Sequence, residues 1–178
     1  MGFGGFGQFG ATKNPEPEGS QSAGAETNWG TADPAPPSDD REFPSLSARL
    51  LDENNRLFDR YEALFALRAL RTKEAVDAIG QSMLKAASPL LRHEAAYVLG
   101  QMQDAHAIPA LEESLRHDPH IMVRHEAAEA LGNIDDPRSE PLLRWALQHD
   151  AAEEVRESCL LALENLGYLR DDTRLEFR

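Results

Sequence analysis

Apolar residues recur at intervals of three and four along most of the chain, which is the spacing of one face of an α-helix. In the segment 91–102 this stripe is formed by Leu91, Ala95, Val98, Leu99 and Met102. The segment 123–134 repeats the arrangement with Val123, Ala127, Ala130, Leu131 and Ile134. Each segment is therefore predicted to be an amphipathic helix that buries one face and exposes the other.

The same pattern returns at a fixed period. An arginine recurs every 32 residues, as Arg60, Arg92, Arg124 and Arg156. A leucine keeps the same period, as Leu67, Leu99, Leu131 and Leu163. Four units with a period in the thirties are typical of a stacked solenoid.

Cap residues predict where helices begin. Ser88-Pro89 and Asp118-Pro119 each place a capping side chain before a proline. Both pairs are predicted to open the second helix of a unit, because proline suits the first helical position. Asp136-Pro137 is predicted to open a first helix in the same way.

Glycines predict where the second helices end. Gly100 and Gly132 are expected to adopt the left-handed conformation that terminates a helix. In the third unit, a first helix is predicted over 108–115. The predicted fold is therefore all-α, a HEAT-like α-α superhelix of about four helix pairs.

The beginning of the chain differs in composition from these repeats. Phe3, Phe6 and Phe9 lie among glycines, and residues 14–40 are rich in Pro, Gly, Ser and acidic residues. Such a segment buries too little apolar surface to offset the entropy of ordering it. We predict a disordered tail or linker over 1–43 (a weak Phe-Gly docking element is the alternative), a HEAT-like repeat domain over 44–170 and a C-terminal tail over 171–178.

Charge and composition narrow the partners and the location. The formal net charge of −13 argues against nucleic acid as a partner, because phosphate binding requires clustered Lys and Arg. It favours a basic partner or a cationic substrate. Cys159 is the only cysteine, so no internal disulfide is expected and a reducing compartment is favoured. No apolar run reaches the roughly 20 residues of a membrane span, so a soluble, cytoplasmic protein is expected.

The repeated arginine and the two positions that follow it distinguish structural residues from candidate functional residues. The arginines occur in every unit and are predicted to be structural, pairing with carboxylates between neighbouring repeats. The next position holds, in order, Tyr61, His93, His125 and Glu157. The one after it holds Glu62, Glu94, Glu126 and Ser158. Only the two central repeats therefore carry a His-Glu pair.

Helical geometry predicts that these pairs can meet. At about 100° per residue, His93 and His125 lie opposite the apolar stripes of their helices. Parallel helices pack about 8–10 Å apart, so two imidazoles can converge on one ion at bonds of about 2 Å. Two histidines with carboxylates and open positions suit non-haem iron, and the same donors also accept zinc or manganese. A solvated pair of surface residues is the alternative.

The remaining histidines share no position in the repeat. They are His106, His117, His120 and His149. We predict that all four are surface residues without a ligand role.

The strings LLRHEAAYVLGQMQDAHAIPAL and MVRHEAAEALGNI resemble the His-Glu motifs of the deoxyhypusine hydroxylase family. The resemblance extends over about 44–166. LLDENNRLFDRYEALFALRAL and VRESCLLALE are similar to the carboxyl-terminal half of that family, and ADPAPPSDD is similar to the linker before it. The resemblance implies a di-iron monooxygenase of HEAT-like repeats in two halves. It would use Fe(2+) and dioxygen to hydroxylate the deoxyhypusine side chain of a translation factor to hypusine.

The resemblance also implies roles for single residues. His93, His125 and Glu126 match positions that hold one iron, and Glu94 matches a position for metal or substrate contact. The family needs four His-Glu pairs and this chain has two. A second copy or a complementary half is therefore expected to complete the two-iron site, with one iron in each half.

Two other functions stay open at this stage. One is a catalytically inactive HEAT-repeat binding module or a truncated remnant of the enzyme, because half of the motifs are missing. The other is an unrelated repeat scaffold, such as the HEAT-like lyases that handle bilins. The match around both His-Glu pairs makes this the least favoured hypothesis.

Overall fold

The computed structural model describes residues 34–167. Within that range every regular element is a helix, and no strand occurs. The helices form four consecutive pairs. In chain order these are α1 (Phe43–Leu51) with α2 (Leu57–Leu70), α3 (Lys73–Lys85) with α4 (Pro89–Met102), α5 (Ile108–His117) with α6 (Ile121–Ile134), and α7 (Glu140–His149) with α8 (Glu153–Asn165). Short 3-10 turns, η1 (Ala105–Ala107) and η2 (Pro137–Ser139), precede α5 and α7.

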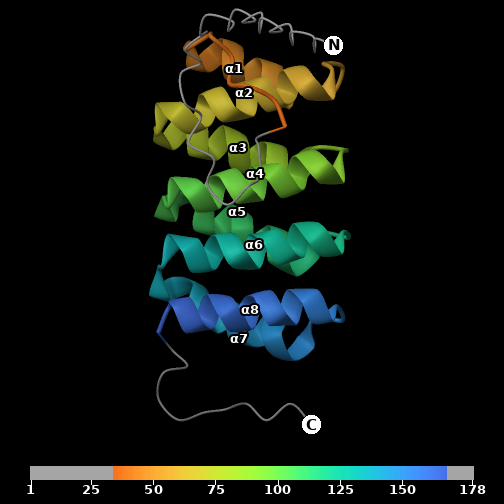
Figure 1. The fold of residues 1–178 in the computed structure, drawn as a ribbon, viewed down its shortest axis with the longest axis vertical. Coiled ribbons are helices and arrows are strands. Elements are labelled where there is room, and N and C mark those ends of the chain that lie inside the picture. Colours follow the sequence, from red (N-terminus) through yellow and green to blue (C-terminus); the bar gives the residue numbers. More distant parts are fainter. Residues whose placement is uncertain (1–33, 168–178) are drawn as a thin grey trace, which may run out of the picture. The chain divides into compact units, whose positions relative to one another are not determined.

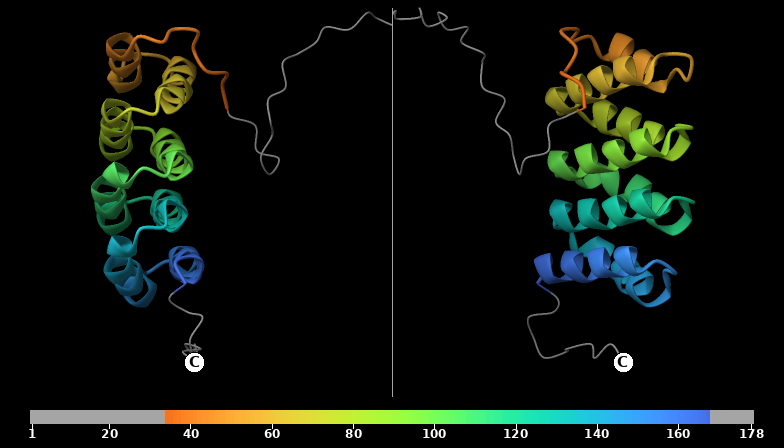
Figure 2. Two further views of the ribbon diagram at one scale, coloured as in Figure 1. Left: turned by 90° about the vertical axis from the view of Figure 1, so that its left-hand side faces the viewer. Right: turned by 45° about the vertical axis from the view of Figure 1, so that its right-hand side comes forward.

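The pairs are stacked one upon another in two layers (Figures 1 and 2). The first helix of each pair lies in one layer, and the second helices, α2, α4, α6 and α8, form the other. The predicted superhelix of four helix pairs is confirmed. Most of the predicted tail 1–43, with Phe3, Phe6 and Phe9, and the whole tail 171–178 lie outside the described residues.

The core lies between the two layers. The predicted stripes of α4 and α6 are buried in it, apart from Ile134, which is partly buried. Cys159 of α8 is buried as a free thiol, and burial raises its pKa to about 12. None of the helices between residues 34 and 167 is long and apolar enough to cross a membrane.

Two of the three predicted starts are confirmed. The Ser88 hydroxyl accepts a hydrogen bond from the backbone N–H of Leu91 at 3.3 Å, and Pro89 is the first residue of α4. The Asp136 carboxylate accepts from the backbone N–H of Arg138 at 2.9 Å and opens η2, which leads directly into α7.

The predicted start at Asp118 is wrong. The helix α6 begins three residues later, at Ile121, with His120 at its cap position. The Asp118 carboxylate accepts from the backbone N–H of His120 at 2.9 Å and also binds Arg92. The Asp118 carboxylate thus serves the ion pair with Arg92 of the neighbouring repeat. The chain makes one more turn before helix α6 begins.

The predicted role of the glycines is also wrong. Helix α4 continues past Gly100, and α6 continues past Gly132. The left-handed residues that follow these helices are Gln103, with a φ of 52°, and Asp135, with a φ of 57°. The two glycines therefore lie inside their helices.

The place of each glycine explains why no larger residue stands there, because each faces the second helix of the following repeat. A Cβ added to Gly100 would lie 2.9 Å from Ala130 Cα, and one added to Gly132 would lie 2.8 Å from Ala162 Cα. Carbon atoms do not pack that closely, since attraction between them is optimal at about 3.5–4.0 Å. Glycine thus lets α4 approach α6, and α6 approach α8, more closely than any larger residue would.

The repeated arginines join successive repeats. Arg92 binds Asp118 through two N–O contacts, of 2.7 and 3.0 Å. Arg124 binds Asp150 in the same way, at 2.8 and 2.9 Å. Two parallel bonds between a guanidinium and a carboxylate fix geometry as well as charge. Pairing with carboxylates between repeats is confirmed for these two arginines.

The first and last arginines differ from this pattern. Arg60 binds Glu53 of its own repeat at 2.7 Å, and Glu53 accepts a hydrogen bond from the backbone N–H of Ala87 in the next repeat at 3.3 Å. Arg156 donates to the backbone carbonyl of Asp150 at 2.8 Å. Both arginines still tie their helix to the preceding loop.

Gly132→Ala is expected to destabilise the fold by about 1–3 kcal/mol, as overpacking of a core does. The added methyl group would meet the backbone of Ala162, which cannot yield without moving α8. Urea unfolding followed by circular dichroism measures the change. Gly80→Ala is the control, because its methyl group would meet only the Ala110 side chain at 3.1 Å. If Gly132→Ala were more stable than the wild type, as helix propensity alone predicts, the close approach would not constrain the fold.

Candidate metal centre

The predicted site residues lie on two adjacent second helices. His93 projects from α4, and His125 and Glu126 project from α6, which packs closely beside it. His93 Nε2 lies 3.2 Å from Glu126 Oε2. The contact therefore joins the histidine of one His-Glu pair to the glutamate of the next.

Burial makes this contact chemically significant. The Glu126 side chain is 9% exposed and that of His93 is 24% exposed. The hydrogen bond that His93 donates to Glu126 raises the pKa of His93, against the opposing effect of burial, and the charges of nearby glutamates raise it further. A buried carboxylate is costly unless a cation or hydrogen-bond donors compensate its charge. Glu126 thus provides a place for positive charge between α4 and α6.

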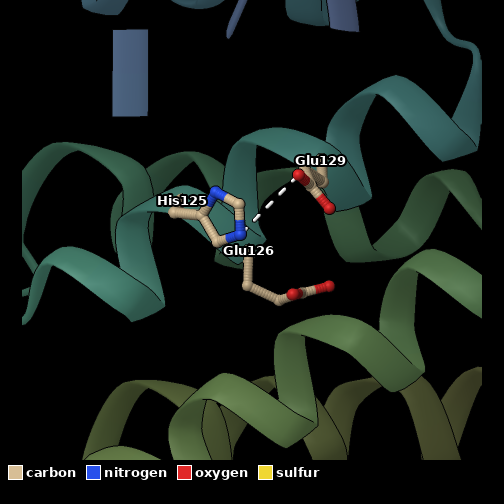
Figure 3. A group of neighbouring side chains, drawn as sticks. All are labelled: His125, Glu126 and Glu129. Atoms are coloured by element: carbon tan, nitrogen blue, oxygen red, sulfur yellow. Dashed lines mark ion pairs between the residues drawn. The ribbon is translucent and has the colours of Figure 1, made fainter. Parts of the chain in front are cut away.

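A second histidine, His125, and a second carboxylate, Glu129, complete the group (Figure 3). One potential ligand atom from each of His125, Glu126 and Glu129 lies within 4.8 Å of the other two. His125 Nε2 lies 3.6 Å from Glu129 Oε1. The group therefore offers an imidazole and two carboxylates to one ion, and His93 adjoins it through Glu126.

Glu94, the fourth predicted ligand, lies outside that compact group. It is half-buried on α4. Its charge contributes to the raised pKa of His93. Burial and the charge of Glu94 together raise the pKa of Tyr61, which occupies the histidine position of the first repeat. Glu94 thus lies next to the site and makes it more negative.

Glu129 was not among the sequence-predicted ligands. The predicted ligands come from the two positions that follow each repeated arginine, and Glu129 lies beyond them. It follows His125 by four residues, a spacing that places two side chains on one face of a helix. That spacing could have identified it.

The other histidines are exposed, as predicted. His106, His117, His120 and His149 all have solvent-exposed positions. Two of them pair locally with acids, His106 with Asp104 at 2.8 Å and His117 with Glu113 at 3.0 Å. Neither pair is joined to the group on α4 and α6.

The donor set suits a metal ion on chemical grounds. Imidazole nitrogens and carboxylate oxygens are the ligands of non-haem iron, and they also bind zinc and manganese. The buried charge of Glu126 and the adjacent Glu129 would be neutralised by a divalent cation. His93, Glu94, His125 and Glu126 therefore stay predicted ligands, with Glu129 as a further neighbour.

A family model described as HEAT repeats matches residues 43–132 and 113–176. The chain belongs to the HEAT-repeat family. This HEAT-repeat chain is similar to deoxyhypusine hydroxylase of Danio rerio, with 49% identity over 67 residues, which cover 38% of this chain and 22% of that protein. The Gallus gallus deoxyhypusine hydroxylase is also 49% identical, over 62 residues that cover 35% of this chain and 20% of that protein. The resemblance to these hydroxylases is confirmed over the matched part.

Solved structures agree with this assignment. Human deoxyhypusine hydroxylase in complex with glycerol superposes with a TM-score of 0.72 at 44% identity, covering 76% of this chain and 47% of that chain. The HEAT-repeat chain thus spans about half the length of the solved relative. The complex of CpcE and CpcF of phycocyanin lyase from Nostoc sp. PCC7120 is 24% identical with a TM-score of 0.52, a likeness that shows the fold alone.

Removal of the Glu126 charge is expected to weaken metal binding. Titration of the chain with Co²⁺, a spectroscopic substitute for Fe²⁺, should saturate one tight site, and Glu126→Gln should weaken it by at least about tenfold. The variant removes the buried charge between the two histidines while retaining its shape. Isothermal titration calorimetry measures the affinity.

The matched control is Glu113→Gln, because Glu113 and His117 form an exposed pair at helical spacing. It should bind Co²⁺ as the wild type does. Equal losses in both variants would mean that Co²⁺ is held by scattered surface acids and not by the group on α6.

Proposed function

We propose that this chain is one half of a deoxyhypusine hydroxylase, which hydroxylates the deoxyhypusine side chain of a translation factor to hypusine. The observation that carries the proposal is the group formed by His93, His125 and Glu126 between α4 and α6. The likeness to the human enzyme, at 44% identity over 76% of this chain, supports it. The proposed location is the cytoplasm, where such a substrate would be found.

In this proposal His93, His125 and Glu126 hold one iron, and Glu129 lies beside them. A bound iron would supply the reaction with dioxygen, in which one oxygen atom enters a C–H bond and the other leaves as water, with two electrons from an external reductant and two protons. Buried Glu126 would compensate the positive charge of the metal. The packing of α4 against α6 fixes the separation of its ligands.

Glu94 is proposed to bind the cationic amine of the substrate. Its carboxylate lies half-buried on α4, immediately beside His93. A carboxylate at this place attracts an ammonium group toward the metal, and the net charge of −13 favours the approach of a basic substrate.

The chain carries two His-Glu pairs, so a second copy or a complementary half is proposed to supply the other iron. The support is an exposed apolar row formed by Phe58, Leu90 and Met122. Each lies three residues before the histidine position of its helix, which holds Tyr61, His93 or His125. That spacing places it on the same face of the helix, one turn earlier. Apolar side chains at one edge of a charged site suit a protein interface better than open solvent.

A second candidate function is a HEAT-repeat binding module without catalytic activity. The observation that favours it is the coverage, since the chain matches only 47% of the solved relative. Such a module, with its net charge of −13, would bind the translation factor but would not oxidise it.

The activity test uses the deoxyhypusine form of the factor, with Fe²⁺, dioxygen and a reductant. Mass spectrometry detects the oxygen atom added to the side chain, and native mass spectrometry gives the number of chains and irons. We expect turnover by a two-chain or two-half assembly, and its loss in the His93→Ala, His125→Ala variant. A His106→Ala, His117→Ala variant is the control. A complex with the factor that holds iron but never adds oxygen would favour the binding module.

The apolar row gives a separate prediction about pairing. Leu90→Glu with Met122→Glu should abolish association of the chain with a second copy or half, because charges would be buried at the contact. Sedimentation velocity measures the association, and circular dichroism confirms the fold. Leu84→Glu is the control, since Leu84 is also an exposed leucine but lies on α3 in the other layer. Undiminished pairing of the double variant would place the interface elsewhere.

A further inference from the structure

Ser158 of α8 touches the proposed metal centre from the last repeat. It occupies the position that holds glutamate in the other three repeats. Its side chain is buried, and its Oγ lies 2.6 Å from His125 Nδ1. The contact therefore ties α8 to a predicted ligand on α6.

The contact is part of a pattern between successive second helices. His93 meets Glu126, 33 residues later, and His125 meets Ser158 at the same separation. The repeat therefore places Glu126 and Ser158 against the histidine position of the preceding second helix. Ser158 contacts His125 in the way that Glu126 contacts His93, but it offers a neutral hydroxyl where Glu126 offers a charged carboxylate.

The hydrogen bonds of Ser158 favour one tautomer of His125. A hydroxyl has one hydrogen to donate. Ser158 Oγ lies 3.0 Å from the backbone carbonyl of Glu154, one turn earlier, and 3.5 Å from Glu129 Oε1. Both oxygens can accept its hydrogen, and the bond to Glu154 is common for serine within a helix. A lone pair of Oγ can then accept from His125, an arrangement in which Nδ1 carries the hydrogen.

The opposite nitrogen is thereby available to a cation. A neutral imidazole with its hydrogen on Nδ1 has its lone pair on Nε2. His125 Nε2 is the atom that lies 3.6 Å from Glu129 Oε1, within the group that includes Glu126 (Figure 3). Histidines that bind metals ordinarily donate their other N–H to a neighbour, which fixes the tautomer and the orientation of the ring.

We propose that Ser158 is a positioning residue of the metal centre, which holds His125 with Nδ1 protonated and Nε2 directed at the ion. The inference rests on the proposed metal centre and adds a residue from outside the His-Glu pairs. The serine of the fourth repeat is therefore part of the site, contributed by a helix that carries no ligand of its own. Its loss leaves all the ligands in place but frees the ring to turn or to change tautomer.

The first test is the tautomer of His125 without metal. Long-range ¹H–¹⁵N NMR of histidine-labelled chain, at a pH well above the imidazole pKa, shows which nitrogen carries the hydrogen. We expect hydrogen on Nδ1 in the wild type and a mixture in Ser158→Ala. Hydrogen on Nε2 in the wild type would overturn the proposal, whatever the variant does.

The second test is Co²⁺ affinity by calorimetry. Ser158→Ala is expected to bind Co²⁺ about 10–100-fold more weakly, as loss of an outer partner does in other metal sites. Ser158→Thr, which keeps the hydroxyl, should recover most of the affinity. Ser114→Ala is the matched control, because Ser114 is a buried helical serine whose hydroxyl has no hydrogen-bond partner, and it should bind as the wild type does.

The outcomes separate this inference from the proposed function. Equal Co²⁺ affinity of the wild type and Ser158→Ala would overturn the positioning role alone. A wild type that binds no Co²⁺ would overturn the metal centre and the positioning role with it. Weaker binding by Ser158→Ala with a changed tautomer, alongside an unchanged Ser114→Ala, supports the proposal.

Discussion

The close approach of α4, α6 and α8 is the constraint on which the candidate site depends. Gly100 faces Ala130 and Gly132 faces Ala162 at separations that leave no space for a Cβ. Side chains of histidine and glutamate are short relative to ordinary helix separations of about 8–10 Å. The contact of 3.2 Å between His93 and Glu126 needs their backbones held close and in fixed register. The close packing at these glycines is therefore what lets the side chains of His93 and Glu126 meet.

The paired arginines secure the same helices at the start of each. Arg92 and Arg124 reach across to Asp118 and Asp150, which lie in the loop before the next second helix. These carboxylates are nearly buried, so each pair resists separation more than an exposed pair would. Helix rotation and sliding are thus limited at one end by ion pairs and further along by glycine contacts. The register that results brings each histidine against a residue 33 positions later.

The sequence allowed the repeat, the buried stripes and the two histidines to be predicted, because periodicity within one helix determines which residues share a face. It did not reveal what those faces meet. Gly100 and Asp118 were each assigned to a helix boundary, since their local preferences match that role, yet contacts with the neighbouring repeat determine their use. Ser158 was missed for the same reason, because its importance arises from a distance between helices that no pattern along one helix contains.

The chemistry coincides with the tight packing along the stack. The glycine position of the second helices is occupied by Arg68 in α2, and α2 packs less extensively on α4 than α4 does on α6. There the histidine position holds Tyr61, a residue large enough to fill a wider space. Where glycine is present, His93 meets Glu126 and His125 meets Ser158. The close backbones and the contacts of the histidine positions thus occur in the same two intervals, α4–α6 and α6–α8. Between α2 and α4 it is the long side chain of Arg68 that reaches across, to Gln101 at 2.6 Å.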